Sequence, residues 1–550
     1  MGITMRNTSP LTSLLKTVVS STVLLSSSVL LHTHAQTSHA QTSQAQTSQV
    51  QAAQTSQAQA VESPEYWYQA GAAALQRQLS QQPNTGRAKN IILFVGDGMG
   101  VSTVTAARIH DGQVQGHSGE ENYLSFEQFP AVALAKTYNT NQQTPDSAGT
   151  MTAMITGIKT KAGLISVNEH SLRANCKSSL GHAIPTFVQQ AEQRGLSTGI
   201  VTTTRITHAT PAATFAHTPE RDWEGDINLP EEAVAHGCKD IASQLIDFNY
   251  GNGLEVALGG GRQFFIPEDG KDPQDQRPGS RKDGRDLTQD WLNKYPASAF
   301  VWNQQQLRDL DTQATQHLLG LFNRSHMNYQ VDRNDADASE PSLPLMTETA
   351  IKILQNNPDG YFLMVEGGRI DHGHHAGNAH RALEDARELS AAVAAALAMT
   401  DPADTLIIVT ADHSHPFTIA GYPTRGNPIL GKVINNDNSG ESTEAAALAG
   451  DNLPYTTLGY RTGRGFAENA GGDNRYRLPA DGGRHDLSAV ETEHSDYHQE
   501  ALVPLAMGTH GGEDVAIYAQ GPWAHLFSST HEQNFIYHVM RHAMGFDAGR

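Results

Sequence analysis

Five short, largely apolar runs are the feature of this 550-residue sequence that most constrains its fold. They cover residues 91–95, 197–202, 361–365, 406–410 and 515–518. Continuous apolar runs of this length indicate strands that are buried on both faces, as in parallel sheets. Amphipathic, helix-like stretches such as 382–393 lie between them. The sequence therefore predicts an α/β fold with a doubly wound, mostly parallel central sheet and helices on both faces.

Acidic residues stand where three of these runs end, namely Asp97, Glu366 and Asp412. In open α/β sheets, ligands bind in the crevice at the carboxyl ends of the strands. One such acid would be explained as a turn residue or a helix cap. Three of them beside histidine-rich motifs favour a functional site.

The histidine-rich motifs contain residue types that bind metals. The segment Asp371-His-Gly-His-His375 is the densest, Asp412-His413 is a second pair, and His510 lies in a glycine-rich stretch. Carboxylate and imidazole ligands suit Zn²⁺, although a histidine-rich tract can also be a low-affinity metal patch. Two neighbouring metal ions could hold the attacking and leaving oxygens of a phosphoryl transfer.

Ser147 is the candidate nucleophile. It follows Asp146 and precedes a helix-compatible run of small residues, 148–154. A helix N-terminus favours anions, which suits a hydroxyl that ionises and then carries a phosphate, although serine at this place can also be a simple cap. The sequence has no HExxH motif and no GxSxG around Ser147, so metalloprotease and α/β-hydrolase interpretations fail.

The charge balance argues against nucleic-acid binding. The chain has 38 Lys and Arg against 58 Asp and Glu, a formal net charge of −20. A phosphate backbone requires clustered basic residues.

The N-terminal 60 residues resemble targeting and linker sequence. Residues 1–35 combine basic residues, a serine-interrupted apolar run and a small-residue cleavage site, so we interpret them as a signal peptide rather than a membrane anchor. Residues 36–60 repeat Ala-Gln-Thr-Ser and are predicted to be a low-complexity linker. The C-terminal residues lack an apolar tail, so no membrane anchor is expected there. Export leads to a periplasmic or secreted location. Such compartments are oxidising, so Cys176 and Cys238 can form a disulfide there. Two unpaired buried thiols are the alternative.

Six motifs, in order along the chain, carry a resemblance to the alkaline phosphatases from about Pro64 to Phe546. They are Gly96-Asp-Gly-Met-Gly100, Pro145-Asp-Ser-Ala-Gly-Thr150, Thr202-Thr-Thr-Arg-Ile-Thr-His-Ala-Thr210, Val365-Glu-Gly-Gly-Arg-Ile-Asp-His-Gly-His-His375, Thr410-Ala-Asp-His-Ser-His415 and Thr509-His-Gly-Gly-Glu-Asp514. In fine detail the chain is similar to the animal-type enzymes, because His208 and His372 stand where the enteric bacterial enzyme has Asp and Lys.

The resemblance implies a phosphate monoester hydrolase that works at alkaline pH on small-molecule substrates. Ser147 would form a phosphoserine, Arg221 would bind phosphate, and Asp146 would orient Arg221. His208 and His372 would lie beside the metal ligands without binding metal themselves. Cys176 and Cys238 match a family disulfide, and a homodimer is expected.

The resemblance also implies two zinc ions and one magnesium ion. One zinc would be bound by Asp371, His375 and His510. The second would be bound by Asp97, Asp412 and His413. Magnesium, which prefers oxygen ligands, would be bound by Asp97, Thr210 and Glu366. The animal enzymes have a further calcium site, which is not expected here because one of its acidic positions is Asn323.

The predicted catalytic domain spans residues 61–550. Within it, the turn-rich stretch of about 414–500 is interpreted as an inserted, crown-like subdomain between two halves of the site.

Three other functions fit the sequence less well. A sulfatase needs a Cys or Ser followed by x-Pro-x-Arg, whereas Ala-Gly-Thr-Met follows Ser147. A phosphodiesterase of the same superfamily usually lacks the magnesium ligands and the arginine that Arg221 matches. A secreted protein that only binds metal or phosphate would not need the adjacent Asp146 and Ser147.

Overall fold

The computed structural model describes residues 63–333, 339–465 and 484–546. The expected signal peptide and linker lie outside the described residues. The chain divides into two compact units, with the boundary between Gln81 and Gln82. The described part of the first unit is helix α2 (Pro64–Ser80), whose Ser63 cap accepts a hydrogen bond from the Tyr66 backbone N–H and which buries none of its residues.

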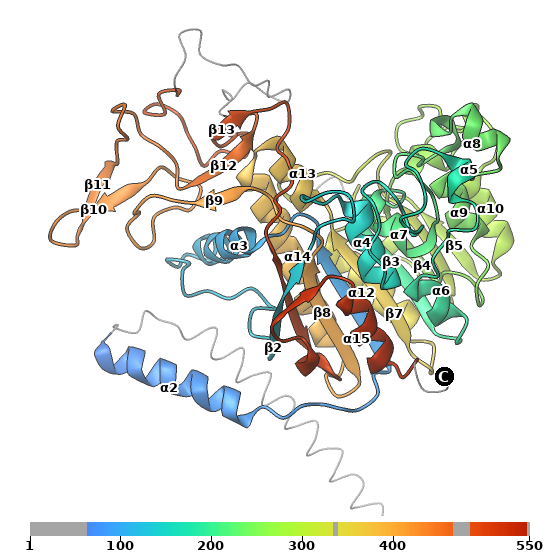
Figure 1. The fold of residues 1–550 in the computed structure, drawn as a ribbon, viewed down its shortest axis with the longest axis horizontal. Helices are drawn as coiled ribbons and strands as arrows, with labels where there is room; N and C mark the ends of the chain where they lie inside the picture. The colour runs from blue at the N-terminus through green and yellow to red at the C-terminus, as the bar shows by residue number, and fades with distance from the viewer. Residues whose placement is uncertain (1–62, 334–338, 466–483, 547–550) are drawn as a thin grey trace, which may run out of the picture. The chain divides into compact units, whose positions relative to one another are not determined.

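The second unit is built around a ten-stranded sheet in the order β15-β2-β14-β8-β1-β7-β3-β4-β6-β5 (Figure 1). The strands are β1 (Asn90–Gly96), β2 (Ala131–Lys136), β3 (Ser197–Arg205), β4 (Val256–Gly260), β5 (Ser298–Val301), β6 (His317–Leu321), β7 (Tyr361–Gly367), β8 (Thr405–Ala411), β14 (Val515–Gln520) and β15 (Thr530–Glu532). The seven strands from β8 to β5 are parallel, and β14 runs antiparallel to both β8 and β2.

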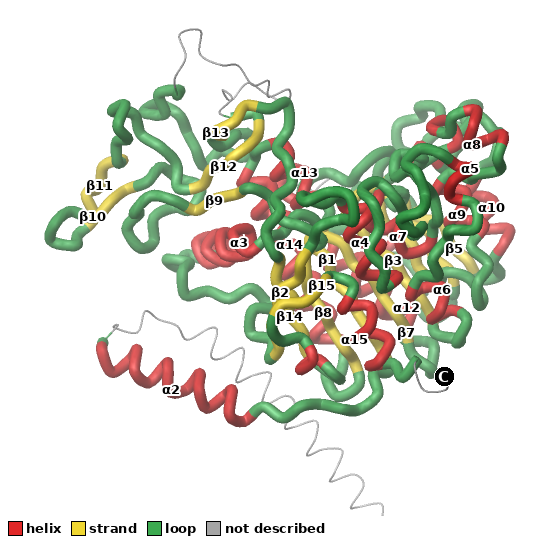
Figure 2. Tube along the Cα trace, in the orientation of Figure 1, coloured by secondary structure: helices red, strands yellow, loops and turns green. Residues whose placement is uncertain are grey.

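Helices cover both faces of this sheet (Figure 2). On one face α12 and α14 pack against each other and against central strands, with α3 beside α14. On the other face α4, α6 and α7 form a layer over β3 and β7, and α15 contacts α4. The helices of this unit are α3 (Val101–Val114), α4 (Ser147–Thr156), α5 (Cys176–Ser179), α6 (Phe187–Glu192), α7 (Ala209–Phe215), α8 (Glu231–Ala235), α9 (Ile241–Asp247), α10 (Leu287–Lys294), α11 (Gln304–Arg308), α12 (Leu343–Leu354), α13 (Arg369–Ala376), α14 (Ala379–Met399) and α15 (Phe535–Ala543).

The predicted α/β architecture is confirmed, and all five predicted strands are present. Strands β7 and β8 are buried along their whole length, as their continuous apolar sequences require. The sequence did not predict β2, whose side chains alternate between buried and exposed, nor β4, where two glycines weaken the apolar pattern.

The stretch between β8 and β14 forms two small sheets of its own. Strands β9 (Phe417–Ile419), β12 (Leu458–Gly463) and β13 (Ala501–Pro504) make one, and β10 (Ile434–Asn436) pairs with β11 (Ser442–Ala446) in the other. Figure 1 shows this region, in orange, on the side of the central sheet where α3 and α13 lie. The boundaries of the inserted subdomain remain a prediction.

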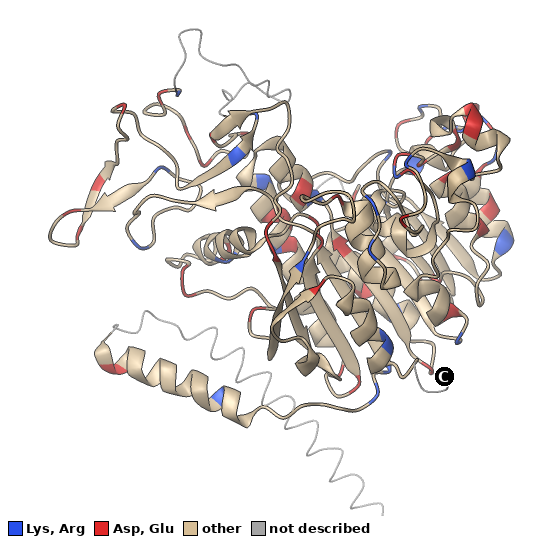
Figure 3. Ribbon diagram, viewed as in Figure 1, with Lys and Arg blue, Asp and Glu red and all other residues tan. Residues whose placement is uncertain are grey.

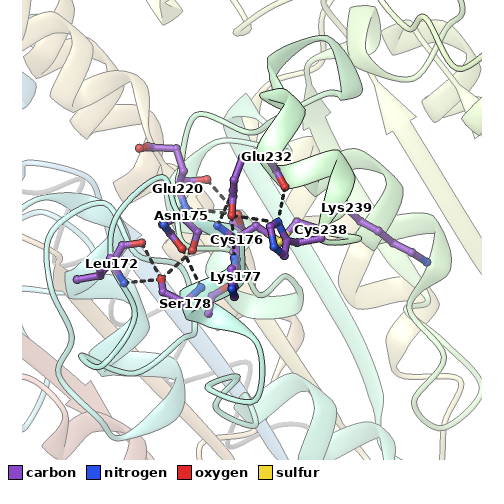
Figure 4. The surroundings of a disulfide bond; sticks show 12 residues. Leu172, Asn175, Cys176, Lys177, Ser178, Glu220, Glu232, Cys238 and Lys239 are labelled. Carbon is purple, nitrogen blue, oxygen red and sulfur yellow. Dashed lines mark hydrogen bonds and ion pairs between the residues drawn. A yellow bond between two sulfur atoms is a disulfide. The ribbon is translucent and has the colours of Figure 1, made fainter.

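Cys176 and Cys238 form a disulfide across 62 residues of sequence (Figure 4). Cys176 is the first residue of α5, and the Glu232 carboxylate on α8 accepts hydrogen bonds from the backbone N–H groups of Cys176 and Lys177 at 3.0 and 3.1 Å. The expected pairing is therefore present in the structure.

Among the described residues, no helix is both long and apolar enough to span a membrane. Lysine and arginine residues are spread over many elements rather than gathered on one (Figure 3).

Candidate active site

Three buried carboxylates meet at the carboxyl end of the central strands. Asp97 follows β1, Glu366 is the second-last residue of β7, and Asp412 follows β8. The strand register places Val95 beside Glu366 and Gly96 beside Ala411, so the three acids lie at one level of the sheet. All three are fully buried. The sheet order thus brings together acids that are far apart in sequence.

Ser147 lies directly beside these acids. It is the first residue of α4, and Asp146 caps the helix by accepting a hydrogen bond from the Gly149 backbone N–H at 3.1 Å. The Ser147 Oγ lies 3.2 Å from His413 Nε2 and 3.5 Å from Asp97 Oδ1. The hydroxyl therefore sits at the positive end of the helix and in contact with two potential metal ligands.

Asp412 and His413 are held in place by the loops around them. The Asp412 Oδ1 accepts hydrogen bonds from the Gly98 and His413 backbone N–H groups, at 3.0 and 2.8 Å. Its other oxygen, Oδ2, accepts one from the Thr150 hydroxyl at 3.2 Å. His413 Nε2 is 3.3 Å from both Asp97 Oδ1 and Asp412 Oδ2. Asp97, Asp412 and His413 therefore form one buried group whose ligand atoms could surround a metal ion.

A second group forms around Asp371 on α13. Its Oδ1 lies 3.3 Å from His375 Nε2, 3.6 Å from His510 Nε2 and 2.6 Å from His415 Nε2. Burial disfavours the Asp371 carboxylate, but the surrounding His375 and His415 rings hold its pKa well below the usual range.

The histidine tautomers in this group suit metal binding. His375 Nδ1 donates to the Gly508 carbonyl at 2.6 Å, and His510 Nδ1 donates to the Pro145 carbonyl at 2.7 Å. Each Nε2 then carries a lone pair, and the two Nε2 atoms face each other at 3.0 Å. Two lone pairs at this distance repel unless a cation lies between them, and a carbonyl partner on Nδ1 is the usual support of a metal-binding histidine. Burial and the neighbouring His413 lower the pKa of His510 to about 3, which keeps the ring neutral.

His415 was not singled out from the sequence. It lies two residues after His413, stacks beside His374 and contacts Asp371. The alternation of side chains in an extended segment is the signal that could have pointed to it. In the structure His415 makes the shortest of the three histidine contacts to Asp371 Oδ1, the oxygen that His375 and His510 also approach.

A third group offers oxygen ligands. Two carboxylate oxygens, Asp97 Oδ2 and Glu366 Oε1, are buried without a hydrogen-bond partner among the described residues, and the Thr210 hydroxyl lies beside Glu366. Burial together with the charge of Asp412 raises the pKa of Glu366 to about 7, and burial with three neighbouring acids also raises the pKa of Asp97. Unpartnered carboxylate oxygens of this kind fit a hard, oxygen-preferring cation.

Arg221 extends toward the nucleophile. Its NH1 donates to Asp146 Oδ2 at 3.2 Å and its NH2 lies 3.1 Å from His208 Nε2. The Gly163 backbone N–H also donates to Asp146 Oδ2, at 2.9 Å, so the carboxylate fixes both the arginine and the loop beside it. A guanidinium held in this way can grip two oxygens of a phosphate.

His208 lies beside this arginine, and the rings of His372 and His326 pack around His208. The sequence did not single out His326. The ring centroid of His326 lies 5.2 Å from that of His208 and 4.4 Å from that of His372. Burial and neighbouring positive charges lower the pKa of all three rings. His326 arrives from the loop after β6, more than 100 residues away from His208, and no local motif marks it.

Asn323, in the same loop, donates from its amide to Glu340 Oε1 at 2.6 Å. The expected absence of a calcium site there stays a prediction.

Comparisons with known proteins find relatives over most of this chain. A sequence model of the family described as alkaline phosphatase matches residues 88–546. The tissue-nonspecific alkaline phosphatase isozyme of Gallus gallus is 46% identical over 490 residues, which cover 88% of this chain and 89% of that protein. The Homo sapiens isozyme is 43% identical over 490 residues, 88% of each chain. The fold is similar to that of the Thermus thermophilus alkaline phosphatase, with a TM-score of 0.59 at 24% identity over 85% of this chain and 93% of that one.

Proposed function

The chain belongs to the alkaline phosphatase family and is a phosphate monoester hydrolase, and from that premise we propose that Ser147 is its nucleophile. The observation that carries the proposal is the position of the Ser147 Oγ, at the N-terminus of α4 and within 3.5 Å of both His413 and Asp97. Storage or transport of phosphate would require no such hydroxyl.

We assign the metal ligands in three groups. Asp371, His375 and His510 would hold one zinc ion, with His415 supporting Asp371. Asp97, Asp412 and His413 would hold the second. Asp97, Glu366 and Thr210 would hold magnesium. The facing Nε2 atoms support the first assignment, and the unpartnered carboxylate oxygens support the last. When bound, these ions would neutralise the phosphate dianion and make the Ser147 hydroxyl more acidic.

The protein's own groups would then position the substrate. A phosphate monoester carries two negative charges, so it is repelled by the site's carboxylates unless positive groups face it. The Arg221 guanidinium would bind two phosphate oxygens, and the N-terminus of α4 would favour negative charge at Ser147. Asp146 would keep Arg221 in place, through the hydrogen bond seen at 3.2 Å.

The reaction would proceed in two displacements at phosphorus. The Ser147 Oγ loses its proton and attacks the phosphorus, the ester bond to the leaving alcohol breaks, and a phosphoserine forms. A water molecule then attacks that phosphorus, the bond to Oγ breaks, and inorganic phosphate leaves while Ser147 regains its proton. Each displacement inverts the configuration at phosphorus, so the two together retain it.

Hydrolysis of p-nitrophenyl phosphate by the purified protein at alkaline pH tests both parts of the proposal. Chelation should abolish activity, and Zn²⁺ with Mg²⁺ should restore it. Ser147→Ala should lower kcat by at least about 10³-fold, because the step through the phosphoserine is lost. Thr150→Ser, on the same helix but with its hydroxyl on Asp412, is the matched control and should remain active.

Two results would contradict the proposal. Full activity of Ser147→Ala would rule out the phosphoserine intermediate. Activity that survives complete removal of the metal ions would rule out the catalytic role of the metal sites. A labelled phosphoserine trapped by acid quenching in the parent protein, but absent from Ser147→Ala, would identify the intermediate directly.

We further propose that the protein is exported, periplasmic or secreted, and that it is a homodimer. The disulfide supports an oxidising compartment. Sedimentation of the purified protein tests the assembly, and a monomer at micromolar concentration would contradict it.

A further inference from the structure

A cluster of three metal-binding residue types lies outside the active site, between helices α3 and α14. His110 is on α3, and His380 and Glu384 are on α14. Their potential ligand atoms all lie within 4.8 Å of one another. We propose that these three side chains bind a divalent transition-metal ion of the zinc class, separate from the ions of the active site.

The spacing on α14 favours this assignment. His380 and Glu384 are four residues apart and therefore lie on the same face of the helix. His110 reaches this face from α3, and its Nε2 is 2.8 Å from Glu384 Oε1. Its ring centroid lies 5.7 Å from that of His380. Two imidazoles and one carboxylate form a common zinc ligand set, which leaves a fourth position for water.

The hydrogen bonds around the cluster leave lone pairs for a metal ion on His380 and Glu384, and His110 Nε2 would exchange its hydrogen bond to Glu384 Oε1 for the ion. His380 Nδ1 donates to the Glu493 carbonyl at 3.0 Å, so its Nε2 carries the lone pair. Glu384 is oriented by Arg387, whose NH1 lies 2.8 Å from Oε2 and 3.0 Å from Oε1. A carboxylate has about four lone-pair positions, so Glu384 can keep this arginine and still bind a metal ion.

The surrounding charges also permit a cation. Asp111 lies next to the cluster, and Arg387 pairs with both Glu384 and Asp111, with its Nε 2.9 Å from Asp111 Oδ1. With neutral histidines, one negative charge is left without a countercharge in this group. Arg381 contributes positive charge near His380, but its guanidinium pairs with Asp332 and Asp496.

The cluster joins three parts of the second unit. Helix α3 follows the loop that carries Asp97, and α14 follows the helix that carries Asp371. The segment around Glu493 belongs to the inserted region, and it is also held by Asn378, whose Nδ2 donates to the Ser495 carbonyl at 2.7 Å. A metal ion at this place would therefore fix the inserted region to α3 and α14, the two helices that follow the segments carrying Asp97 and Asp371. We infer a structural role for the ion, because none of its ligands contacts Ser147 or Arg221.

The test is the zinc content of the purified protein after loading with excess Zn²⁺ and gel filtration, measured by mass spectrometry. His380→Ala and Glu384→Gln should each contain one zinc less per chain than the parent protein, and hydrolysis of p-nitrophenyl phosphate should be unchanged. His117→Ala, at an exposed position just after α3, is the matched control and should keep the full content.

A second measurement separates a metal site from a simple ion pair. Zn²⁺ added to protein whose active-site ions are already bound should raise the thermal midpoint of the parent and of His117→Ala, and this increase should be lost in both cluster variants. Equal zinc content in the parent and the two variants would overturn the proposal, whichever way activity changes. Activity reports on the active site alone. If the parent and all variants lacked activity, the proposed function would be contradicted, whereas the difference in zinc content between parent and variants would still test the site between α3 and α14.

Discussion

Two regions of this molecule bury carboxylates in opposite ways. At the active-site edge, Asp97, Glu366 and Asp412 are fully buried without an arginine or lysine partner among the described residues, and Arg221 pairs with Asp146 instead. What we call the arginine-paired region consists of two buried acids near β4, Asp272 and Asp240, and each of them faces a guanidinium. Arg262 makes two hydrogen bonds of 2.9 Å to Asp272, with both side chains fully buried. Arg281 binds Asp240 in the same way, at 3.0 Å.

The difference shows that the arginine-paired region serves the stability of the fold, whereas the active-site edge is arranged to bind ions. In a buried ion pair each charge is balanced by its partner, so the acids of the arginine-paired region need no ion from outside the protein once it has folded. The acids of the active-site edge repel one another, which is part of the reason that the pKa values of Asp97 and Glu366 are raised. Their charge is balanced only when cations arrive from outside. The fold therefore keeps a cluster of buried carboxylates available for metal ions at the cost of its own stability.

Metal removal is the largest expected effect and the most direct way to break this comparison. Ions that bind only the folded protein stabilise it by about 4 kcal/mol each at a concentration 1,000 times Kd, so chelation should lower the thermal midpoint markedly. Hydrogen exchange measured with and without chelator should show lost protection in α4 and α13 but not in residues 256–286. Equal loss of protection in both regions would contradict the distinction.

Loss of one arginine in the paired region is the next largest effect. Arg262→Met should destabilise the protein by about 3–5 kcal/mol in urea unfolding, because it leaves Asp272 buried and unpaired. The kcat of the folded fraction should not change. The control is Arg277→Met, which removes a pair with Asp275 that is largely exposed on the arginine side, and about 0–1 kcal/mol is expected there. A smaller cost for Arg262 than for Arg277 would show that the paired region is not self-sufficient.

Glu192 and Glu255 sharpen the comparison, because they are buried acids with neither arginine nor metal. Both are nearly inaccessible to solvent. Burial, with repulsion between the two, raises the pKa of Glu192 to about 9, and burial raises that of Glu255 to about 7. Because the pKa of Glu192 is raised in the folded state, its contribution to the free energy of unfolding is fully present below the ordinary pKa of 4.5. This contribution is lost as the pH rises through about 9.

Glu192→Gln should therefore make stability less dependent on pH. Relative to the parent, the variant should gain at least about 1.4 kcal/mol between pH 6 and pH 10, the equivalent of one pKa unit. Urea unfolding at pH 6, 8 and 10 measures this, with the exposed Glu169→Gln as the control for loss of one charge. Parallel pH profiles of parent and variant would mean that Glu192 is ionised in the folded protein at neutral pH.

Much of the catalytic edge could be predicted from the sequence because its signals are local. Asp97 and Asp412 each follow an apolar run directly, and the strands β1 and β8 end where those runs end. The small residues after Ser147 form the predicted helix, with Asp146 as its cap. Period, length and capping are properties of a few neighbouring residues, so they can be read without knowing the rest of the fold.

The residues that sequence reasoning missed depend on contacts between distant segments. His415 matters because it meets Asp371 at 2.6 Å, and His326 because its loop carries it to His372. Nothing in the local sequence marks Arg262 and Asp272 as a buried ion pair, and the Arg262 guanidinium also donates to the Leu321 carbonyl at the end of β6, which ties the pair to a distant strand.

The sequence by itself determined the α/β class, the positions of the central strands and the residue types at their ends, because hydrophobic period and helix capping act over short stretches. Only the tertiary structure decided which of 26 histidines face a carboxylate and which buried acids have a partner. Those outcomes depend on the strand order β8-β1-β7-β3, and that order is set by packing of the whole sheet rather than by any single segment.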